Sequence, residues 1–313
     1  MPFKRVPQTF NCAINTVAIG TGERAIKLGG ENVLPLYSFD APIENPPKVG
    51  VELSDLGPNF DLPGIAEYYA GAGTLAEQAV RACEMPGADF LCLCLDSADP
   101  DGKNASAADC AALCKQVAGA INKPLAIMGC MSEEKNGELF EKLAQALEGE
   151  NILFLSAGEE NYKVVAAAAG LAYGQKLGAV SAVDVNLAKQ LNVLIKEIGV
   201  PGESVVMDIG SAAAGYGFEY VSSTMERIKL AALAQNDQML QPPIITPVSR
   251  EAWSVKEAMA PQSEIPEWGP AEQRGIGMEI ATASACLAAG SNAVILMHPD
   301  SAGTIARLIR ELI

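Results

Sequence analysis

The feature that most constrains the fold is a motif that recurs eight times between residues 49 and 313: a short apolar run, a polar tip with small residues, and a stretch of helical periodicity. The runs are apolar on both faces, as in parallel strands that are covered by helices. The predicted strands are 49–53, 88–95, 125–128, 152–155, 179–183, 205–208, 244–247 and 293–297. The predicted helices are 65–82, 107–121, 134–147, 161–175, 187–198, 218–233, 272–289 and 301–312. Eight strand–helix units that close on themselves form a TIM (β/α)8 barrel.

The first 48 residues do not share this pattern. Two short alternating runs, 15–20 and 24–28, flank Thr21-Gly22-Glu23, which is a hairpin signal. A proline-rich segment at 42–47 then leads into the first barrel strand. We therefore predict an N-terminal β-hairpin extension and linker at 1–48, whose hairpin closes the bottom of the barrel, and a barrel domain at 49–313.

Charge and cysteine spacing exclude several classes of function. The formal net charge of −16 argues against nucleic acid or an anionic membrane as a partner, because both require basic patches. The eight cysteines include no C-x-x-C pair and no iron–sulfur ligand pattern, so buried thiols are expected. No apolar run reaches the roughly 18 residues of a membrane helix, and no signal peptide is visible, so we expect a cytoplasmic protein.

The working face of such a barrel lies at the carboxyl ends of its strands. The polar and small residues predicted there are Glu52, Asp55, Asp96–Asp99, Gly129, Cys130, Ser156–Gly158, Asp184–Asn186, Asp208–Gly217, Thr246, Pro247 and His298–Asp300. The stretch 208–217 stands out, because an acid that ends a buried strand is followed by glycines that allow close backbone approach to a ligand. For each strand-end acid, acid–base chemistry and helix capping remain alternatives.

Committed catalytic groups are scarce at this rim. The sequence has no G-x-S-x-G elbow and no phosphate-binding G-x-x-x-x-G-K-[ST] loop. His298 is the sole histidine, so a structural role is favoured over a zinc or non-haem iron site. The rim therefore resembles a docking surface more than a reaction centre.

The longest interruption of the repeat, 249–273, contains both tryptophans of the chain, Trp253 and Trp268. Aromatic residues in an insertion above the rim suggest a surface for a partner or a ligand. Packing of the same side chains onto the barrel is an equal alternative.

One stretch carries a family resemblance: Asp208-Ile209-Gly210-Ser211-Ala212-Ala213-Ala214-Gly215-Tyr216-Gly217-Phe218-Glu219-Tyr220, with Met225-Glu226-Arg227-Ile228. It resembles the small subunit of the corrinoid/iron–sulfur protein of the anaerobic acetyl-CoA pathway, the counterpart of the delta subunit of the archaeal acetyl-CoA decarbonylase/synthase complex. Supporting segments run along the chain in order, at 28–30, 34–35, 87–89, 95–102, 160–163, 184–186, 189–192, 251–253, 256–258 and 272–275. The resemblance therefore covers most of the chain.

The resemblance implies a subunit that is not catalytic alone and that forms one half of a heterodimeric methyl carrier. The large subunit would hold the iron–sulfur cluster and most of the cobalamin contacts, and the barrel top of this chain would face the corrinoid at the interface. A methyltetrahydrofolate methyltransferase would supply the methyl group, and acetyl-CoA synthase would receive it. The implied cofactor contacts are Asp96, Ser97, Asp184, Asn186, Asp208, Gly210, Gly215, Tyr216 and Gly217, with no metal ligand and no catalytic residue.

A stand-alone pterin-binding methyltransferase is the main alternative, and an unrelated barrel enzyme is a further one. Folate-dependent methyltransferases of the same fold grip the pterin with strand-end Asp and Asn residues, and Asp96, Asp184, Asn186 and Asp208 stand at comparable positions. The loop that follows Asp208 counts against this alternative, because its side chains at 211–214 are small and have little capacity to hydrogen-bond a pterin.

Overall fold

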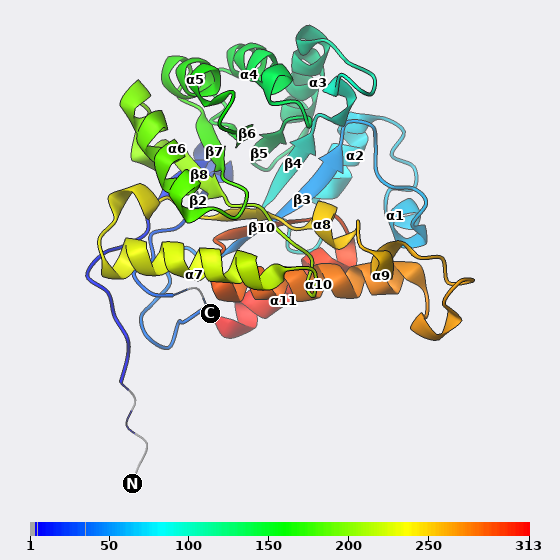
Figure 1. Ribbon diagram of the computed structural model, residues 1–313. Coiled ribbons are helices and arrows are strands. Elements are labelled where there is room, and N and C mark those ends of the chain that lie inside the picture. Colours follow the sequence, from blue (N-terminus) through cyan, green and yellow to red (C-terminus); the bar gives the residue numbers. More distant parts are fainter. Residues whose placement is uncertain (1–3, 5, 35) are drawn as a thin grey trace.

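A computed structural model describes residues 4, 6–34 and 36–313 of the chain. Residues 1–3, 5 and 35, which belong to the predicted extension and its linker, lie outside the described residues. Eight parallel strands form one sheet in the order β8-β7-β6-β5-β4-β3-β10-β9. A bridge between Met207 and Ile244 joins the two end strands and closes the sheet into a barrel. The predicted TIM barrel is confirmed (Figure 1).

The eight strands appear in the predicted order, with bounds that mostly agree with the prediction. They are β3 (Lys48–Ser54), β4 (Phe90–Cys94), β5 (Leu125–Met128), β6 (Leu153–Ala157), β7 (Lys176–Val180), β8 (Val205–Asp208), β9 (Ile245–Pro247) and β10 (Ala293–Leu296). One position is wrong: the fifth barrel strand, predicted at 179–183, ends at Val180. Ala182 and Val183 instead have φ of 41° and 62°, in the left-handed region. The sequence pattern does not predict this turn.

Helices surround the barrel and alternate with the strands. They are α1 (Pro63–Tyr68), α2 (Leu75–Cys83), α3 (Ala107–Ala120), α4 (Glu133–Ala146), α5 (Tyr162–Val165) continued by a π-helix (Ala166–Ala172), α6 (Val185–Ile198), α7 (Phe218–Ala234), α8 (Ser249–Ala252), α9 (Lys256–Met259), α10 (Ala271–Ala289) and α11 (Pro299–Leu312). The single helix predicted at 65–82 is wrong. Gly71, at φ 84°, breaks it, and Thr74 starts a second helix with a capping box to Glu77.

The barrel interior is filled by side chains from alternate positions of the strands. These inward-facing residues are Phe90, Cys92, Cys94, Ala126, Met128, Leu153, Leu155, Val206, Ile245, Ala293 and Ile295. Glycine at position 50 of β3 makes room for the largest of them, because a Cβ there would lie 2.4 Å from Phe90 Cζ. The interior is therefore a packed core and not a channel.

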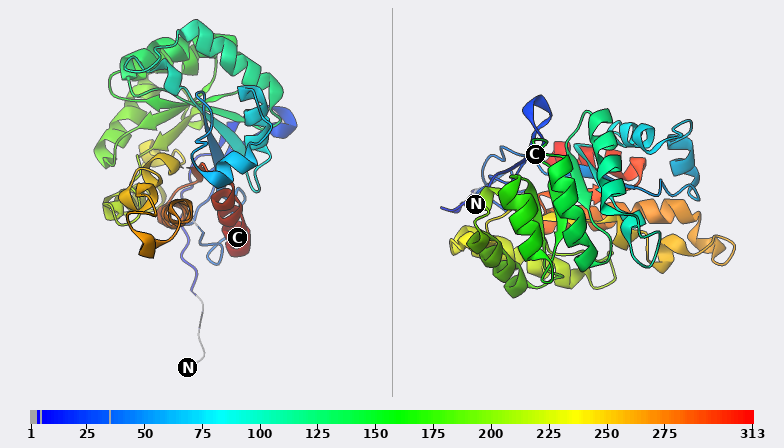
Figure 2. Two further views of the ribbon diagram at one scale, coloured as in Figure 1. Left: turned by 90° about the vertical axis from the view of Figure 1, so that its right-hand side faces the viewer. Right: turned by 90° about the horizontal axis from the view of Figure 1, so that it is seen from above.

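The N-terminal hairpin closes one end of the barrel, as predicted. Strands β1 (Val17–Ile19) and β2 (Ile26–Leu28) pair antiparallel, and Val17, Ile19 and Leu28 join the apolar cluster of the barrel interior. Figure 2 shows the hairpin and the carboxyl terminus at the end opposite to the loops that follow the barrel strands. The carboxyl ends of the strands are thus left as the open face.

A buried ion pair fastens the extension to the barrel. Lys229 Nζ of α7, which is fully buried, donates to Glu31 Oε1 at 3.0 Å and to Asn292 Oδ1 at 2.6 Å. The Asn292 side chain donates to the same Glu31 oxygen at 2.7 Å. Burial lowers the pKa of Lys229, but Glu31 opposes this shift and keeps the ammonium compensated. Three distant parts of the chain therefore meet in one network.

We expect Glu31→Ala to lower the free energy of unfolding by about 3–5 kcal/mol, because it leaves the Lys229 ammonium buried without its counter-ion. The double variant Glu31→Ala/Lys229→Met should show a clearly smaller loss of unfolding free energy, because it no longer buries an uncompensated charge. Urea denaturation at constant pH measures both. A single variant within about 0.5 kcal/mol of wild type would contradict the assigned role of the ion pair.

Candidate functional site

The alternation of the strands directs acids into the mouth of the barrel. On β3, Val51 and Leu53 pack outward against the helices, so Glu52 points inward; on β8, Val206 lies in the interior and Asp208 shares its face. Both acids stand toward the carboxyl end of their strands, below the loops. The mouth is therefore lined by carboxyl groups from opposite sides.

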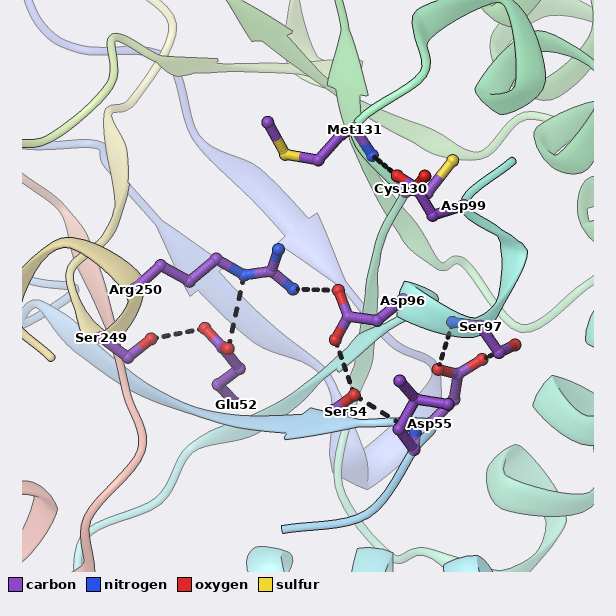
Figure 3. A network of polar contacts seen from close by, with 12 residues as sticks. Glu52, Ser54, Asp55, Asp96, Ser97, Asp99, Cys130, Met131, Ser249 and Arg250 are labelled. Carbon is purple, nitrogen blue, oxygen red and sulfur yellow. Dashed lines mark hydrogen bonds and ion pairs between the residues drawn. The ribbon is translucent and has the colours of Figure 1, made fainter. Parts of the chain in front are cut away.

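Arg250, which follows β9 closely, is the centre of a polar network in this mouth (Figure 3). Its Nε lies 3.4 Å from Glu52 Oε1, and its Nη2 lies 2.8 Å from Asp96 Oδ1. Ser249 Oγ donates to the second oxygen of Glu52, and Ser54 Oγ donates to Asp96 Oδ2 at 2.6 Å. Burial raises the pKa of Glu52, although Arg250 opposes this shift. One guanidinium thus ties β3 and the loop after β4 to the segment after β9, across the intervening β10.

A second pair of contacts extends this network along the rim. Asp55 accepts two hydrogen bonds from Ser97, one from its backbone N–H at 2.9 Å and one from its hydroxyl. Asp99 accepts from the backbone N–H of Met131 at 3.2 Å, which joins the loops after β4 and β5. Asp96 and Ser97, both expected to contact a cofactor, are therefore held by side chains of the rim itself.

Sequence reasoning missed Arg250 as a member of the site. The signal that could have found it is its position, because a lone arginine just after a strand lies within reach of the strand-end acids of the neighbouring loops.

Asp208 is a rim acid beside which the described residues place no cation. Its side chain is buried, and its Oδ1 accepts from the backbone N–H of Gly210 at 2.9 Å. Burial raises the pKa of Asp208 from 3.8 to about 6. In the sheet order β8 lies four strands from β4 in either direction, so Asp208 stands across the barrel from Asp96.

The loop after β8 consists mainly of glycine and other small residues, so its backbone is accessible. Gly215 and Gly217 have φ of 89° and 87°, a conformation that favours glycine. A Cβ on Gly215 would meet no atom of the described residues within 4 Å. Tyr216, between them, is 49% exposed and donates its hydroxyl to Glu257 of α9. The loop therefore presents one aromatic ring between two glycines.

Asp184 and Asn186 lie together at the start of α6, and both are exposed. Asp184 caps the helix, accepting from the backbone N–H of Asn186 at 2.7 Å and of Leu187 at 3.1 Å. The loop that carries them is adjacent to β8, because the N–H of Val183 donates to the carbonyl of Ile209 at 2.7 Å. For Asp184, capping is thus the role that the structure shows.

His298 has a structural environment, in line with the favoured interpretation. The residue is 2% exposed, its Nδ1 accepts from the N–H of Asp300 at 3.2 Å, and its Nε2 lies 3.3 Å from Glu272 Oε1. Trp253 stacks on it at 6.0 Å between ring centroids.

Glu279 accepts from the backbone N–H groups of Met297 and His298, and burial raises its pKa to about 7.

The two tryptophans of the 249–273 insertion have different roles. Trp253 packs against α10 at Gly275, where a Cβ would lie 2.1 Å from the indole. Trp268 is exposed, with Lys256 Nζ and Arg274 Cζ each 6.0 Å from its ring. Arg274 also donates to three backbone carbonyls of the insertion and fixes its shape. The packing alternative therefore holds for Trp253, and the surface alternative stays a prediction for Trp268.

All eight cysteines are free, and all except Cys12, which is partly exposed, are buried. In the part of the chain that the structure describes, no three His, Cys, Asp or Glu side chains are grouped closely enough to hold a metal ion. Over the same residues, the structure has no helix with the length and apolarity needed to cross a bilayer.

We expect Asp208→Asn to stabilise the fold at pH 8 by about 2–3 kcal/mol and to have little effect at pH 4. The folded chain keeps the Asp208 proton up to about pH 6, whereas the unfolded chain releases it near pH 3.8. The free energy of unfolding of the wild-type chain must therefore fall as the pH rises through this window. The Asp208→Asn variant, whose amide does not titrate, should not show this fall. Urea midpoints measured from pH 4 to 8 test this.

The helix cap Asp184→Asn is the matched control, because it makes the same change of functional group at a site where the acid is not deeply buried. We expect its stability to stay within about 0.5 kcal/mol of wild type across the same pH range. Equal pH profiles for the Asp208 and Asp184 variants would contradict the raised pKa of Asp208 in the folded chain.

Comparison with known proteins gives the chain a family. The sequence profile of the CO dehydrogenase/acetyl-CoA synthase delta subunit matches residues 16–283. The acetyl-CoA decarbonylase/synthase complex subunit delta 1 of Methanosarcina thermophila is 32% identical over 94% of this chain and 67% of its own length. The corresponding subunit of Archaeoglobus fulgidus is 33% identical over 94% of this chain and 65% of its own length. The chain thus spans about two thirds of these relatives.

Solved structures with a similar fold include dihydropteroate synthases. The enzyme from Xanthomonas albilineans aligns with a TM-score of 0.57 at 14% identity, over 95% of this chain and 98% of its own. That from Thermus thermophilus aligns with a TM-score of 0.53 at 16% identity, over 95% of this chain and 100% of its own. At this identity the likeness shows the barrel fold alone. By sequence, the chain belongs to the CO dehydrogenase/acetyl-CoA synthase delta subunit family.

Proposed function

We propose that this chain is the small subunit of a heterodimeric corrinoid/iron–sulfur methyl carrier of the acetyl-CoA pathway. The observation that carries the proposal is the family match, which covers residues 16–283, from the hairpin into α10. In this function the large subunit holds the iron–sulfur cluster and most of the cobalamin. A methyltetrahydrofolate methyltransferase provides the methyl group, and acetyl-CoA synthase accepts it.

The residues of the mouth fit a corrinoid that a partner holds from the other side. The cobalt of the corrinoid carries the methyl group when the cofactor is bound. His298 does not suit cobalt ligation, because both ring nitrogens are engaged and the ring is buried. The open backbone at Gly215 and Gly217 and the ring of Tyr216 suit close approach of a flat macrocycle. Asp96, Ser97 and Asp208 would line the mouth beneath it.

Asp208 supports the second candidate, a pterin-binding methyltransferase. A buried carboxyl group without a cation can accept hydrogen bonds from the N–H groups of a heterocycle in the mouth. Against it, Asp184 and Asn186 lie at the start of a helix, where Asp184 serves as the cap. We therefore place this function second, and calorimetric titration with methyltetrahydrofolate separates the two.

We expect the purified chain alone to be colourless, with neither cobalt nor iron, and to bind methyltetrahydrofolate weakly or not at all. Coexpression with the large subunit should give a stoichiometric complex with corrinoid and iron–sulfur absorbance. Absorption spectra and metal analysis of both preparations test this. A chain that remains alone and binds methyltetrahydrofolate by itself would favour the second candidate.

We expect Tyr216→Ala to lower the corrinoid content of the heterodimer severalfold while its thermal midpoint changes little, because an exposed ring contributes little to folding. The control is Leu171→Ala, which removes an exposed apolar side chain far from the rim. Cobalt per heterodimer is the measured quantity. Equal cobalt in the two variants would remove Tyr216 from the corrinoid site.

A further inference from the structure

Three large apolar side chains are exposed beside the barrel mouth, on two segments that are far apart in sequence. Tyr220, in the first turn of α7, is 69% exposed; Met259, at the end of α9, is 66% exposed; and Trp268 is 41% exposed. We call these three residues the rim patch. Exposed apolar side chains that gather in one area indicate an interaction surface, whereas single ones do not.

The two segments that carry the rim patch are fixed to one another. Tyr216, one turn before Tyr220, donates to Glu257, which lies in the same short helix as Met259. Lys256 of that helix lies over the Trp268 ring. Arg274 holds the carbonyls of Glu257, Ala260 and Gly269, so the insertion does not depend on a partner for its shape. The surface is therefore preorganised, which lowers the entropic cost of binding.

The border of the rim patch is acidic. Glu219, Glu264 and Glu267 are exposed around it, and the whole chain carries a formal charge of −16. The nearby cations, Lys256 and Arg274, are placed against the Trp268 ring. An apolar centre with an acidic border is complementary to an apolar surface with Lys or Arg at its edge.

The position of the rim patch separates it from the mouth. The insertion lies beyond the amino-terminal end of α10, on the side of α1, where the loops after the strands extend away from the barrel (Figures 1 and 2). A partner seated on the mouth would reach the rim patch with a neighbouring part of its own surface. The mouth and the rim patch can therefore serve one partner in two ways, the first through a cofactor and the second through protein contacts.

We propose that the rim patch is the protein-docking surface for the partner subunit that covers the barrel mouth. The partner would contact it with an apolar segment bordered by basic residues. This inference rests on the proposed function, because it takes the partner to be the subunit that holds the corrinoid. A second copy of this chain is a poor occupant, since two acidic borders would repel each other.

The test uses the coexpressed heterodimer and the double variant Tyr220→Asp/Met259→Asp. Both side chains are exposed, so the fold should be retained, as circular dichroism would show. We expect the affinity for the large subunit to fall by about tenfold or more, because carboxylates replace apolar contacts. Raising the salt concentration should also weaken the wild-type complex, because its borders are oppositely charged.

The matched control is Leu230→Asp, which changes a residue 42% exposed on the same helix as Tyr220 but away from the rim. Its affinity should match that of wild type. A double variant that binds as tightly as the control overturns the docking surface and leaves the proposed function standing. A wild-type chain that never pairs with the large subunit overturns both. If the wild-type chain forms a homodimer and the double variant is a monomer, the rim patch binds a second copy of this chain, and the proposed heterodimer surface is overturned.

Discussion

Closure of the barrel is the constraint on which the remaining features depend. Once eight parallel strands close, every second side chain must fit an interior whose volume is set by the strand number. Phe90 fits only because residue 50 is glycine, and the hairpin residues Val17, Ile19 and Leu28 fill the amino end. With one end filled, the inward positions at the other end become the mouth. The acids at Glu52 and Asp208 are therefore placed by the same alternation that builds the core.

The fold could be predicted from the sequence because periodicity reports burial directly. The eight strands, the hairpin and most helix bounds follow from it. Periodicity fails where the backbone departs from regular geometry: residues 181–183 look like strand, but Ala182 and Val183 adopt left-handed angles. The division between α1 and α2 was missed for a similar reason, because Gly71 and the capping box at Thr74 act locally against a continuous apolar pattern.

The candidate site was less predictable, because its residues meet only through the tertiary fold. Strand-end acids could be named from the sequence, and Asp96 and Asp208 do stand at the mouth. The sequence could not show which of these acids forms an ion pair, because Arg250 lies 154 residues after its partner Asp96. The result is an asymmetric mouth: Glu52 and Asp96 share the guanidinium of Arg250, whereas the described residues place no counter-charge beside Asp208.

The Lys229–Glu31–Asn292 network has a consequence for the order in which the chain folds during synthesis. Glu31 leaves the ribosome early, but its two partners are 198 and 261 residues further along the chain. Contacts so distant in sequence form late, because a long loop must close first. The extension can therefore complete its contacts only after Asn292, just before the last strand, has been made. A chain that ends before residue 292 lacks Asn292 and so leaves the Lys229–Glu31 pair without one of its hydrogen-bond partners.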